Sequence, residues 1–245
     1  MSTILVTGGT GTLGTLVTPL LRDAKLRILS RHAPAGAAEH VACDLLSGEG
    51  LEAAVDGVDV VLHLAGGPKG DDVATANLVK AAERAGLSHF VLISVIAADR
   101  VPLGYFTRKF EAEKTVIASG LPWTILRAAQ FHGFCLDAVR AAAKLPVVPV
   151  PGGMRFQPVD AHDVAARLAE LTLGAPAGRV ANLAGPKVYT MRELVEDYLR
   201  ANGKRRPKLP VHLPGKAGRA YRAGDNLNLD AETGTRTWEE FLAQN

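Results

Sequence analysis

Cysteine and net charge are both scarce in this chain. Among its 245 residues only Cys43 and Cys135 are cysteines, and 28 basic against 25 acidic residues leave a formal net charge of +3. Two isolated cysteines provide neither a disulfide framework nor the spacing of a metal site, so we expect a reducing compartment and no bound metal. The small net charge argues against nucleic acid as a partner.

Long apolar runs are also missing. No run reaches the roughly 18 apolar residues that are needed to span a bilayer. The first residues, MSTILVTGG, lack the charged start, apolar middle and cleavage site of a signal peptide. We therefore expect a cytoplasmic protein, monomeric or homodimeric, with no membrane partner.

The apolar residues that are present form short runs between longer segments of helical spacing. Nearly continuous apolar runs are typical of strands that are buried on both faces of a parallel sheet. The alternation predicts an α/β fold, a doubly wound parallel sheet with helices on both faces. The predicted strands cover residues 3–7, 25–30, 40–44, 58–65, 89–94 and 123–128.

A glycine-rich stretch, TGGTGTLG at residues 7–14, joins the first predicted strand to the first helical pattern. It contains G-x-G-x-x-G from Gly9 and G-x-x-G-x-x-G from Gly8, with Gly14 last in both frames. Glycines allow the backbone to approach a pyrophosphate, and N–H groups at the start of a helix bind phosphates. A plain glycine-rich turn is the alternative. We predict cofactor binding by Gly8, Thr10, Gly11, Thr12, Leu13 and Gly14.

The end of the second predicted strand, SRH, indicates which dinucleotide binds. An acidic residue there would bind the ribose 2′-hydroxyl of NAD, whereas this chain has Ser30, Arg31 and His32. Arginine suits a 2′-phosphate through its charge and its planar set of donors. NADP(H) is therefore favoured over NAD(H), with a solvated surface charge as the alternative for Arg31.

Two later strand ends are also expected to lie near the dinucleotide. Asp44 and Leu45 follow the third predicted strand beside the expected adenine, although Asp44 is explained equally well as a loop cap. The residues that follow the fourth strand are small, which lets the backbone pass close to the cofactor. They are Ala65, Gly66 and Gly67.

The composition changes after about residue 145, where Pro and Gly become frequent. We predict an NADP-binding Rossmann core over residues 1–145, to which some later segments return, and a small C-terminal substrate lobe over residues 146–245. Pro and Gly also interrupt the basic stretch at residues 203–224. We predict a solvated loop there, with a phosphate-binding patch as the alternative.

These stretches, together with residues 105–134 and the FQPVDAHDVA segment, resemble the short-chain dehydrogenase/reductases, in the extended or atypical branch that includes the NmrA-like NAD(P)H-binding proteins. The resemblance covers most of the chain and implies Tyr105 and Lys109 as catalytic residues, four positions apart on one helix face. It implies that Lys109 lowers the pKa of Tyr105, a proton donor to a developing alkoxide, and binds the nicotinamide ribose. Ser94 is expected beside the cofactor, with a hydrogen bond to backbone groups alone as the alternative.

The chain departs from the family pattern at three positions. Val95 stands where the active pattern has Ser or Thr, Asp71 where extended members have Asn, and Ala128 where Pro usually follows an arginine. Conventional carbonyl reduction is thereby called into question, whereas dinucleotide binding is not.

The AAQFHGF stretch at residues 128–134 is predicted to form a loop over the nicotinamide. A structural or solvent-facing role is the alternative for its histidine, and His63, inside an apolar strand, is expected to be a satisfied core residue. The substrate-side candidates are Gln130, Phe131, His132 and Phe134.

The sequence favours an NADPH-dependent reductase that transfers hydride to a small carbonyl or quinone substrate, aromatic substrates included. Quinones accept hydride readily and conjugation stabilises their oxyanion, so an incomplete set of Ser, Tyr and Lys still suffices. One alternative is a non-catalytic NADP(H) redox sensor. The other is a nucleotide-sugar epimerase or dehydratase, against which the short lobe argues.

Overall fold

The main sheet is entirely parallel and contains nine strands among the residues that the computed structural model describes, 2–31, 39–67 and 69–245. Their order across the sheet is β13-β10-β6-β5-β4-β1-β2-β3, with β9 paired to β6. The predicted doubly wound sheet is confirmed. The strands are β1 (Thr3–Thr7), β2 (Lys25–Ser30), β3 (Glu39–Ala42), β4 (Val60–His63), β5 (His89–Val95), β6 (Trp123–Ala128), β9 (Gly178–Arg179), β10 (Leu183–Ala184) and β13 (Glu232–Thr233).

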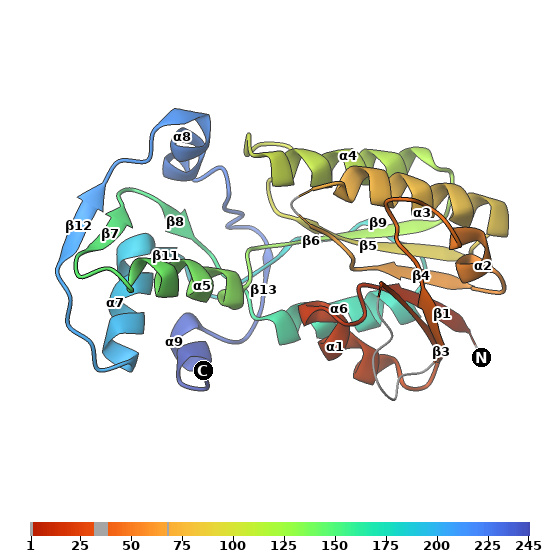
Figure 1. The fold of residues 1–245 in the computed structure, drawn as a ribbon, viewed down its shortest axis with the longest axis horizontal. Coiled ribbons are helices and arrows are strands. Elements are labelled where there is room, and N and C mark those ends of the chain that lie inside the picture. The colour runs from red at the N-terminus through yellow and green to blue at the C-terminus, as the bar shows by residue number, and fades with distance from the viewer. Residues whose placement is uncertain (1, 32–38, 68) are drawn as a thin grey trace.

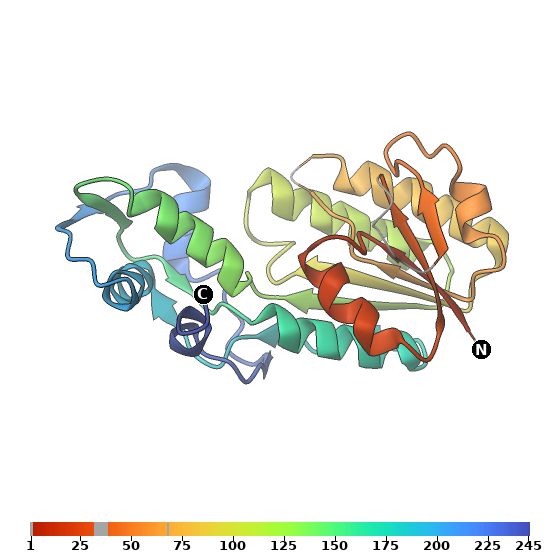
Figure 2. The same ribbon diagram turned by 60° about the horizontal axis from the view of Figure 1, so that its bottom comes forward.

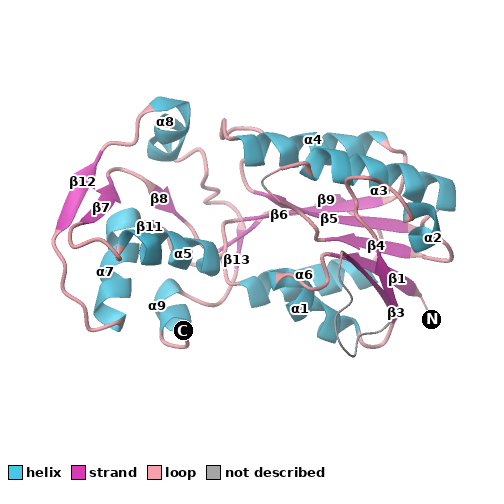
Figure 3. Ribbon diagram, viewed as in Figure 1, coloured by secondary structure: helices cyan, strands magenta, loops and turns pink. Residues whose placement is uncertain are grey.

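Two helical layers cover this sheet, as Figures 1 and 3 show. One face carries α2 (Leu51–Val55), α3 (Asp71–Ala85) and α4 (Gly104–Ala118), and the other carries α1 (Thr12–Val17), η1 (Thr18–Leu21) and α6 (Ala161–Leu173). Every residue of β4 and β5 is buried, as expected for strands covered on both sides. The first helix changes from α to 3-10 geometry at Thr18, next to Pro19, which has no N–H to donate to an α-helical hydrogen bond.

The strand order changes direction between β1 and β4. The chain proceeds outward through β1, β2 and β3 and then returns to the other side of β1 to form β4, β5 and β6. Thr7 pairs with both Leu29 and His63, so β1, β2 and β4 end at the same level. Ligands of open α/β sheets bind at such a switch point, outside the carboxyl ends of the strands.

A smaller group of elements, which we call the C-terminal lobe, lies at one end of the molecule (Figures 1 and 2). In it β7 pairs with β12 in parallel and β8 with β11 antiparallel. The chain enters the lobe at α5 and goes back to the main sheet with α6, β9 and β10. It then re-enters the lobe from β11 to α8, adds β13 to the main sheet, and ends in the lobe with α9. The lobe contains α5 (His132–Ala142), β7 (Val148–Pro151), β8 (Arg155–Phe156), β11 (Tyr189–Thr190), α7 (Met191–Ala201), β12 (Lys208–Val211), α8 (Gly215–Ala223) and α9 (Trp238–Leu242).

The predicted loop at residues 203–224 is wrong, because this segment contains both β12 and α8. Pro210 is accommodated because β12 is an edge strand whose only strand partner among the described residues is β7. Among the described residues no helix combines the length and apolar composition that crossing a bilayer requires.

Candidate functional site

The glycine loop, residues 8–11, follows β1 at the switch point and leads into α1. Gly8 has a φ of +69°, and a Cβ there would lie 2.8 Å from the backbone nitrogen of Ala65. A Cβ at Gly14 would overlap the backbone of Gly8 and Gly9, so only glycine lets α1 approach β1 this closely. The spacing that a dinucleotide-binding loop requires is thus realised in the backbone.

The polar side chains of this loop differ in accessibility. Thr10 and Thr12 are exposed beside Gly11, whose N–H donates to the Gly8 carbonyl at 2.9 Å. Leu13 is only 7% exposed and belongs to the core. Leu13 can therefore offer a ligand its backbone but not its side chain.

A buried chain of hydrogen bonds lies beneath the glycine loop. The Ala65 N–H donates to Thr7 Oγ1 at 3.1 Å, and Thr7 Oγ1 lies 2.6 Å from His63 Nδ1. His63 Nε2 lies 3.0 Å from Thr75 Oγ1, which donates to the Asp71 carbonyl at 2.7 Å. The expectation that His63 is a satisfied core residue is confirmed, and the chain connects the ends of β1 and β4 to the start of α3.

The neutral form of His63 makes stability depend on pH. Burial lowers the pKa of His63 from its ordinary 6.5 to about 3, so between these pH values the unfolded chain binds a proton that the folded chain does not. Above pH 6.5 both forms of the chain carry neutral His63, and the free energy of unfolding does not depend on this group. Between pH 6.5 and about 3 the free energy of unfolding is expected to fall by about 1.4 kcal/mol for each pH unit by which the pH drops. Urea unfolding of the wild type and His63→Gln at pH 7 and pH 5 measures this. Equal losses in the two proteins would exclude His63 as the source.

The end of β2 carries the residues predicted to read the ribose. Ser30 Oγ lies 2.9 Å from His40 Nε2, and Arg31 is exposed directly after the strand. His32 lies outside the described residues. Arg31 is thus accessible beside the switch point.

Asp44, after the end of β3, has the contact expected of a loop cap. The carboxylate of Asp44 accepts the N–H of Leu46 at 3.0 Å, a local turn contact. Leu45 is buried in the core. The Asp44 side chain is exposed, so the local contact does not remove it from the surface.

A buried ion pair joins α4 to α3 beside the glycine loop. Lys109 Nζ lies 3.2 Å from Asp71 Oδ2, and the two side chains are only 4% and 1% exposed. Lys109 also donates to the Ile93 carbonyl at 3.2 Å. A Cβ at Gly66 would lie 2.9 Å from both Lys109 Nζ and Asp71 Oδ1, so the pair lies directly against the backbone that follows β4.

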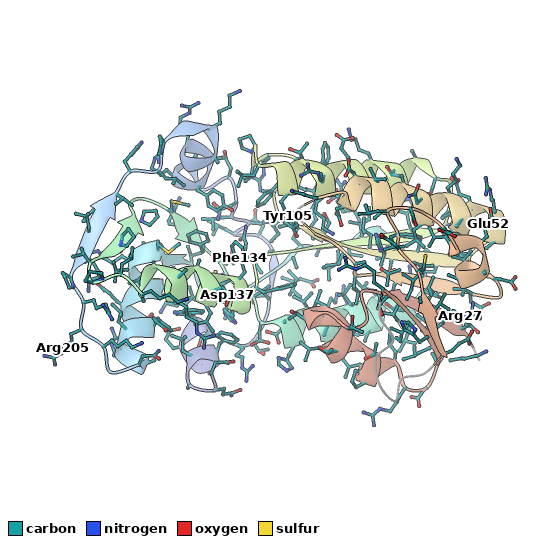
Figure 4. The ribbon with its side chains drawn as sticks, viewed as in Figure 1. Arg27, Glu52, Tyr105, Phe134, Asp137 and Arg205 are labelled. Carbon is teal, nitrogen blue, oxygen red and sulfur yellow. The ribbon has the colours of Figure 1, made fainter. Side chains whose placement is uncertain are left out.

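Tyr105 occupies the same helix one turn before Lys109 and is 40% exposed. Figure 4 places it where α4 faces the C-terminal lobe. Burial, followed by the negative charge of Asp71, raises the pKa of Tyr105 to about 12. The predicted lowering of this pKa by Lys109 is therefore wrong, because burial and the Asp71 carboxylate both raise it, while the Lys109 ammonium is paired with Asp71.

Ser94 takes part in a buried network that the sequence did not reveal. Its hydroxyl donates to Glu113 Oε1 at 2.5 Å, and the same carboxylate accepts two bonds from Arg127, at 2.8 and 2.7 Å, and one from Arg179 at 3.0 Å. Glu113 is fully buried, four residues after Lys109 on α4. The only local signal for Glu113 was its position four residues after Lys109, on the same face of α4. Its partners Ser94, Arg127 and Arg179 lie on separate strands, so the sequence could not indicate them. The cofactor contact of Ser94 stays a prediction.

The predicted loop at residues 128–134 is wrong in its second half, because α5 begins at His132. His132 is 1% exposed, its ring lies 5.0 Å from that of Phe241, and its Nδ1 lies 3.7 Å from Asp160 Oδ2. Burial lowers the pKa of His132. The substrate-side assignment of His132 is thus corrected to the structural alternative.

The other three substrate candidates lie near the boundary between the main sheet and the lobe. Phe131 is partly buried against the core, Gln130 is partly buried beside Tyr221, and Phe134 is 61% exposed. Figure 4 shows Phe134 and Tyr105 in the region where the two parts meet. Tyr221, on α8, was not among the predicted residues, because its segment was expected to be a loop.

Comparison with known proteins agrees with the geometry of the glycine loop. The sequence model of a family described as NAD(P)H-binding matches residues 8–172. A (4-alkanoyl-5-oxo-2,5-dihydrofuran-3-yl)methyl phosphate reductase from Streptomyces griseus subsp. griseus is 32% identical, and an NAD(P)H azoreductase from Xenophilus azovorans is 31% identical. Each alignment covers 82% of this chain and 74% of the relative.

Solved structures show the same architecture. The NADPH-dependent quinone oxidoreductase QOR2 of Escherichia coli, complexed with NADPH, superposes with a TM-score of 0.84 at 22% identity. The superposition covers 98% of this chain and 99% of that chain. At this identity the likeness bears on the fold alone. Within the described part of the chain, no three His, Cys, Asp or Glu side chains are grouped to hold a metal.

Proposed function

The chain belongs to the NAD(P)H-binding family, and from this premise we propose that it is an NADPH-dependent reductase of the atypical short-chain dehydrogenase/reductase type. The observation that carries the proposal is the glycine loop at the switch point, with buried Lys109 close to it. When bound there, the cofactor supplies a hydride to a small-molecule acceptor. The protein's own part is to bind, orient and shield the two reactants.

The residues present fit a dinucleotide. Gly8 and Gly14 leave space that a Cβ would fill, and the exposed residues Thr10 and Thr12 offer backbone N–H groups to a pyrophosphate. Lys109 has three donors, of which one points to Asp71 and one to Ile93, so the third serves a ribose hydroxyl. Ala65, Gly66 and Gly67 would line the path between these two groups.

The 2′-phosphate is assigned to Arg31. Its guanidinium is exposed at the end of β2, so Arg31→Ala is expected to raise the dissociation constant of NADPH by about 10-fold or more, as for loss of a charge-assisted hydrogen bond. NADH lacks the phosphate, and its affinity should change by less than about twofold. Fluorescence titration of both dinucleotides measures this. Equal losses for NADPH and NADH would contradict the assignment.

The acceptor is proposed to be a small quinone or conjugated carbonyl. The names of the three proteins compared above describe an unsaturated oxo-dihydrofuran, an azo compound and a quinone as substrates, and each of these groups is conjugated. Conjugation spreads the electron pair that arrives with the hydride, which reduces the need for a strong proton donor. Exposed rings of Tyr105 and Phe134 would suit a flat substrate.

The direct test is the loss of NADPH absorbance when the purified protein meets quinones, aldehydes and ketones, with NADH and no-protein controls. Turnover with any acceptor class supports the reductase.

The raised pKa of Tyr105 favours one second candidate, a redox sensor that binds NADP(H) without turnover. Tight NADPH binding with no oxidation by any acceptor would support that sensor and contradict the reductase.

A further inference from the structure

Asp71 is a charged residue whose side chain is almost completely buried. Its side chain is 1% exposed, and apart from the ion pair with Lys109 neither carboxylate oxygen has a hydrogen-bond partner among the described residues. A buried carboxylate with so few partners is costly unless its charge is compensated. Its placement as the first residue of α3 supplies part of that compensation through the helix dipole.

The charged side chains next to Asp71 and Tyr105 along the chain lie on α3 and α4, and the hydrogen-bond chain from β4 ends at Asp71. Asp71 and Asp72 begin α3, Arg108 and Lys109 lie on α4, and His63, on β4, is neutral because burial lowers its pKa to about 3. Arg108 Nε lies 3.9 Å from Asp72 Oδ1, and Lys109 is paired with Asp71. Both cations are thus next to carboxylates. Burial, and after it the negative charge of Asp71, raises the pKa of the Tyr105 phenol.

We propose that Asp71 is a specificity-determining positioning residue, which holds the charge of Lys109 and thereby restricts the site to acceptors that need no proton from Tyr105. This inference rests on the proposed function. It names the acceptor class of that site as quinones and similarly conjugated groups, in preference to simple aldehydes and ketones.

The chemistry of the two acceptor classes differs in where the proton is needed. In a simple aldehyde the hydride forms a C–H bond, the C=O π bond breaks, and its electron pair becomes an alkoxide. The alkoxide must take a proton from Tyr105, which leaves a tyrosinate close to the carboxylate of Asp71, an unfavourable pairing of like charges. A quinone spreads the same electron pair over its ring as a hydroquinone monoanion, which takes its proton from water afterwards.

The first test needs no cofactor. Tyrosine-labelled protein is titrated by carbon NMR, and the Tyr105 signal is assigned by its loss in Tyr105→Phe. Asp71→Asn is expected to lower the pH at which Tyr105 begins to ionise, because it removes the opposing charge and releases that of Lys109. Asp72→Asn, the half-buried neighbour whose carboxylate lies beside Arg108, is the matched control and should leave the titration unchanged. An unchanged titration in Asp71→Asn overturns the proposal.

The second test compares acceptors. The ratio of aldehyde to quinone turnover is expected to rise about 10-fold or more in Asp71→Asn and to return to the wild-type ratio in Asp71→Asn/Tyr105→Phe. Thermal melts establish folding, and Asp71→Ser replaces Asp71→Asn if that variant does not fold. A shifted titration with an unchanged ratio overturns the specificity role. Absence of wild-type turnover with every acceptor overturns the reductase itself, and the Tyr105 titration shows whether the charge effect nevertheless exists.

Discussion

Lys109→Met is expected to lower NADPH-dependent turnover by about 100-fold or more, the scale typical of losing a residue that orients and polarises reactants. It is also expected to lower the free energy of unfolding by about 3–5 kcal/mol, because Asp71 stays buried without its cation. Both side chains are almost inaccessible to solvent, so screening by water does little to reduce this cost. Initial rates and chemical denaturation measure the two effects separately.

A paired variant separates catalysis from folding. In Lys109→Met/Asp71→Asn the unpaired charge is gone, so most of the lost stability should return while turnover stays low. If the double variant recovers turnover together with stability, Lys109 has only a structural role. Turnover of Lys109→Met within about threefold of the wild type would likewise contradict the role assigned to Lys109.

Gly14→Ala is expected to raise the dissociation constant of NADPH by roughly 10- to 100-fold, the equivalent of an overpacking cost of about 1–3 kcal/mol. The added methyl group would overlap the backbone of Gly8 and Gly9, which cannot move aside as a flexible side chain would. The glycine loop and α1 must therefore separate, and the N–H groups lose their arrangement. Fluorescence titration with NADPH measures the loss.

Gly133→Ala is the matched control for this substitution. Gly133 lies within α5, and a Cβ there would meet no heavy atom within 4 Å. Alanine should leave NADPH affinity unchanged and raise the free energy of unfolding by about 0.5–1 kcal/mol, because it is the better helix former. Equal loss of NADPH binding in both alanine variants would show that the effect does not come from the glycine loop.

Strands, helix ends and the glycine loop could be predicted, because the residues that determine each of them lie within a short segment of the sequence. The strands β4 and β5 follow from continuous apolar runs, and the glycine loop follows from spacing that only a close backbone approach requires. Helix α3 also ends at a local signal, because Gly86 directly after it adopts the left-handed conformation that stops a helix. In each case the signal and its structural cause lie within about 15 residues of one another.

Features that depend on distant partners could not be predicted. The spacing of Tyr105 and Lys109 correctly put both residues on one helix, but the effect of Lys109 depends on Asp71, which comes from a different helix. His132 was expected in a loop, whereas it is buried against Phe241. The two residues are more than one hundred positions apart, so the sequence around His132 could not indicate this contact. Local patterns carry no information on such pairs, and the electrostatics of the site follow from them.

The most direct measurement of the central claim compares the initial rates of NADPH oxidation with a naphthoquinone and a naphthaldehyde of matched size. We expect turnover with the quinone that depends on the protein, and a rate with the aldehyde lower by about 10-fold or more. Oxidation of NADPH by neither acceptor, or a faster rate with the aldehyde, would contradict the account of this site as a reductase for conjugated acceptors.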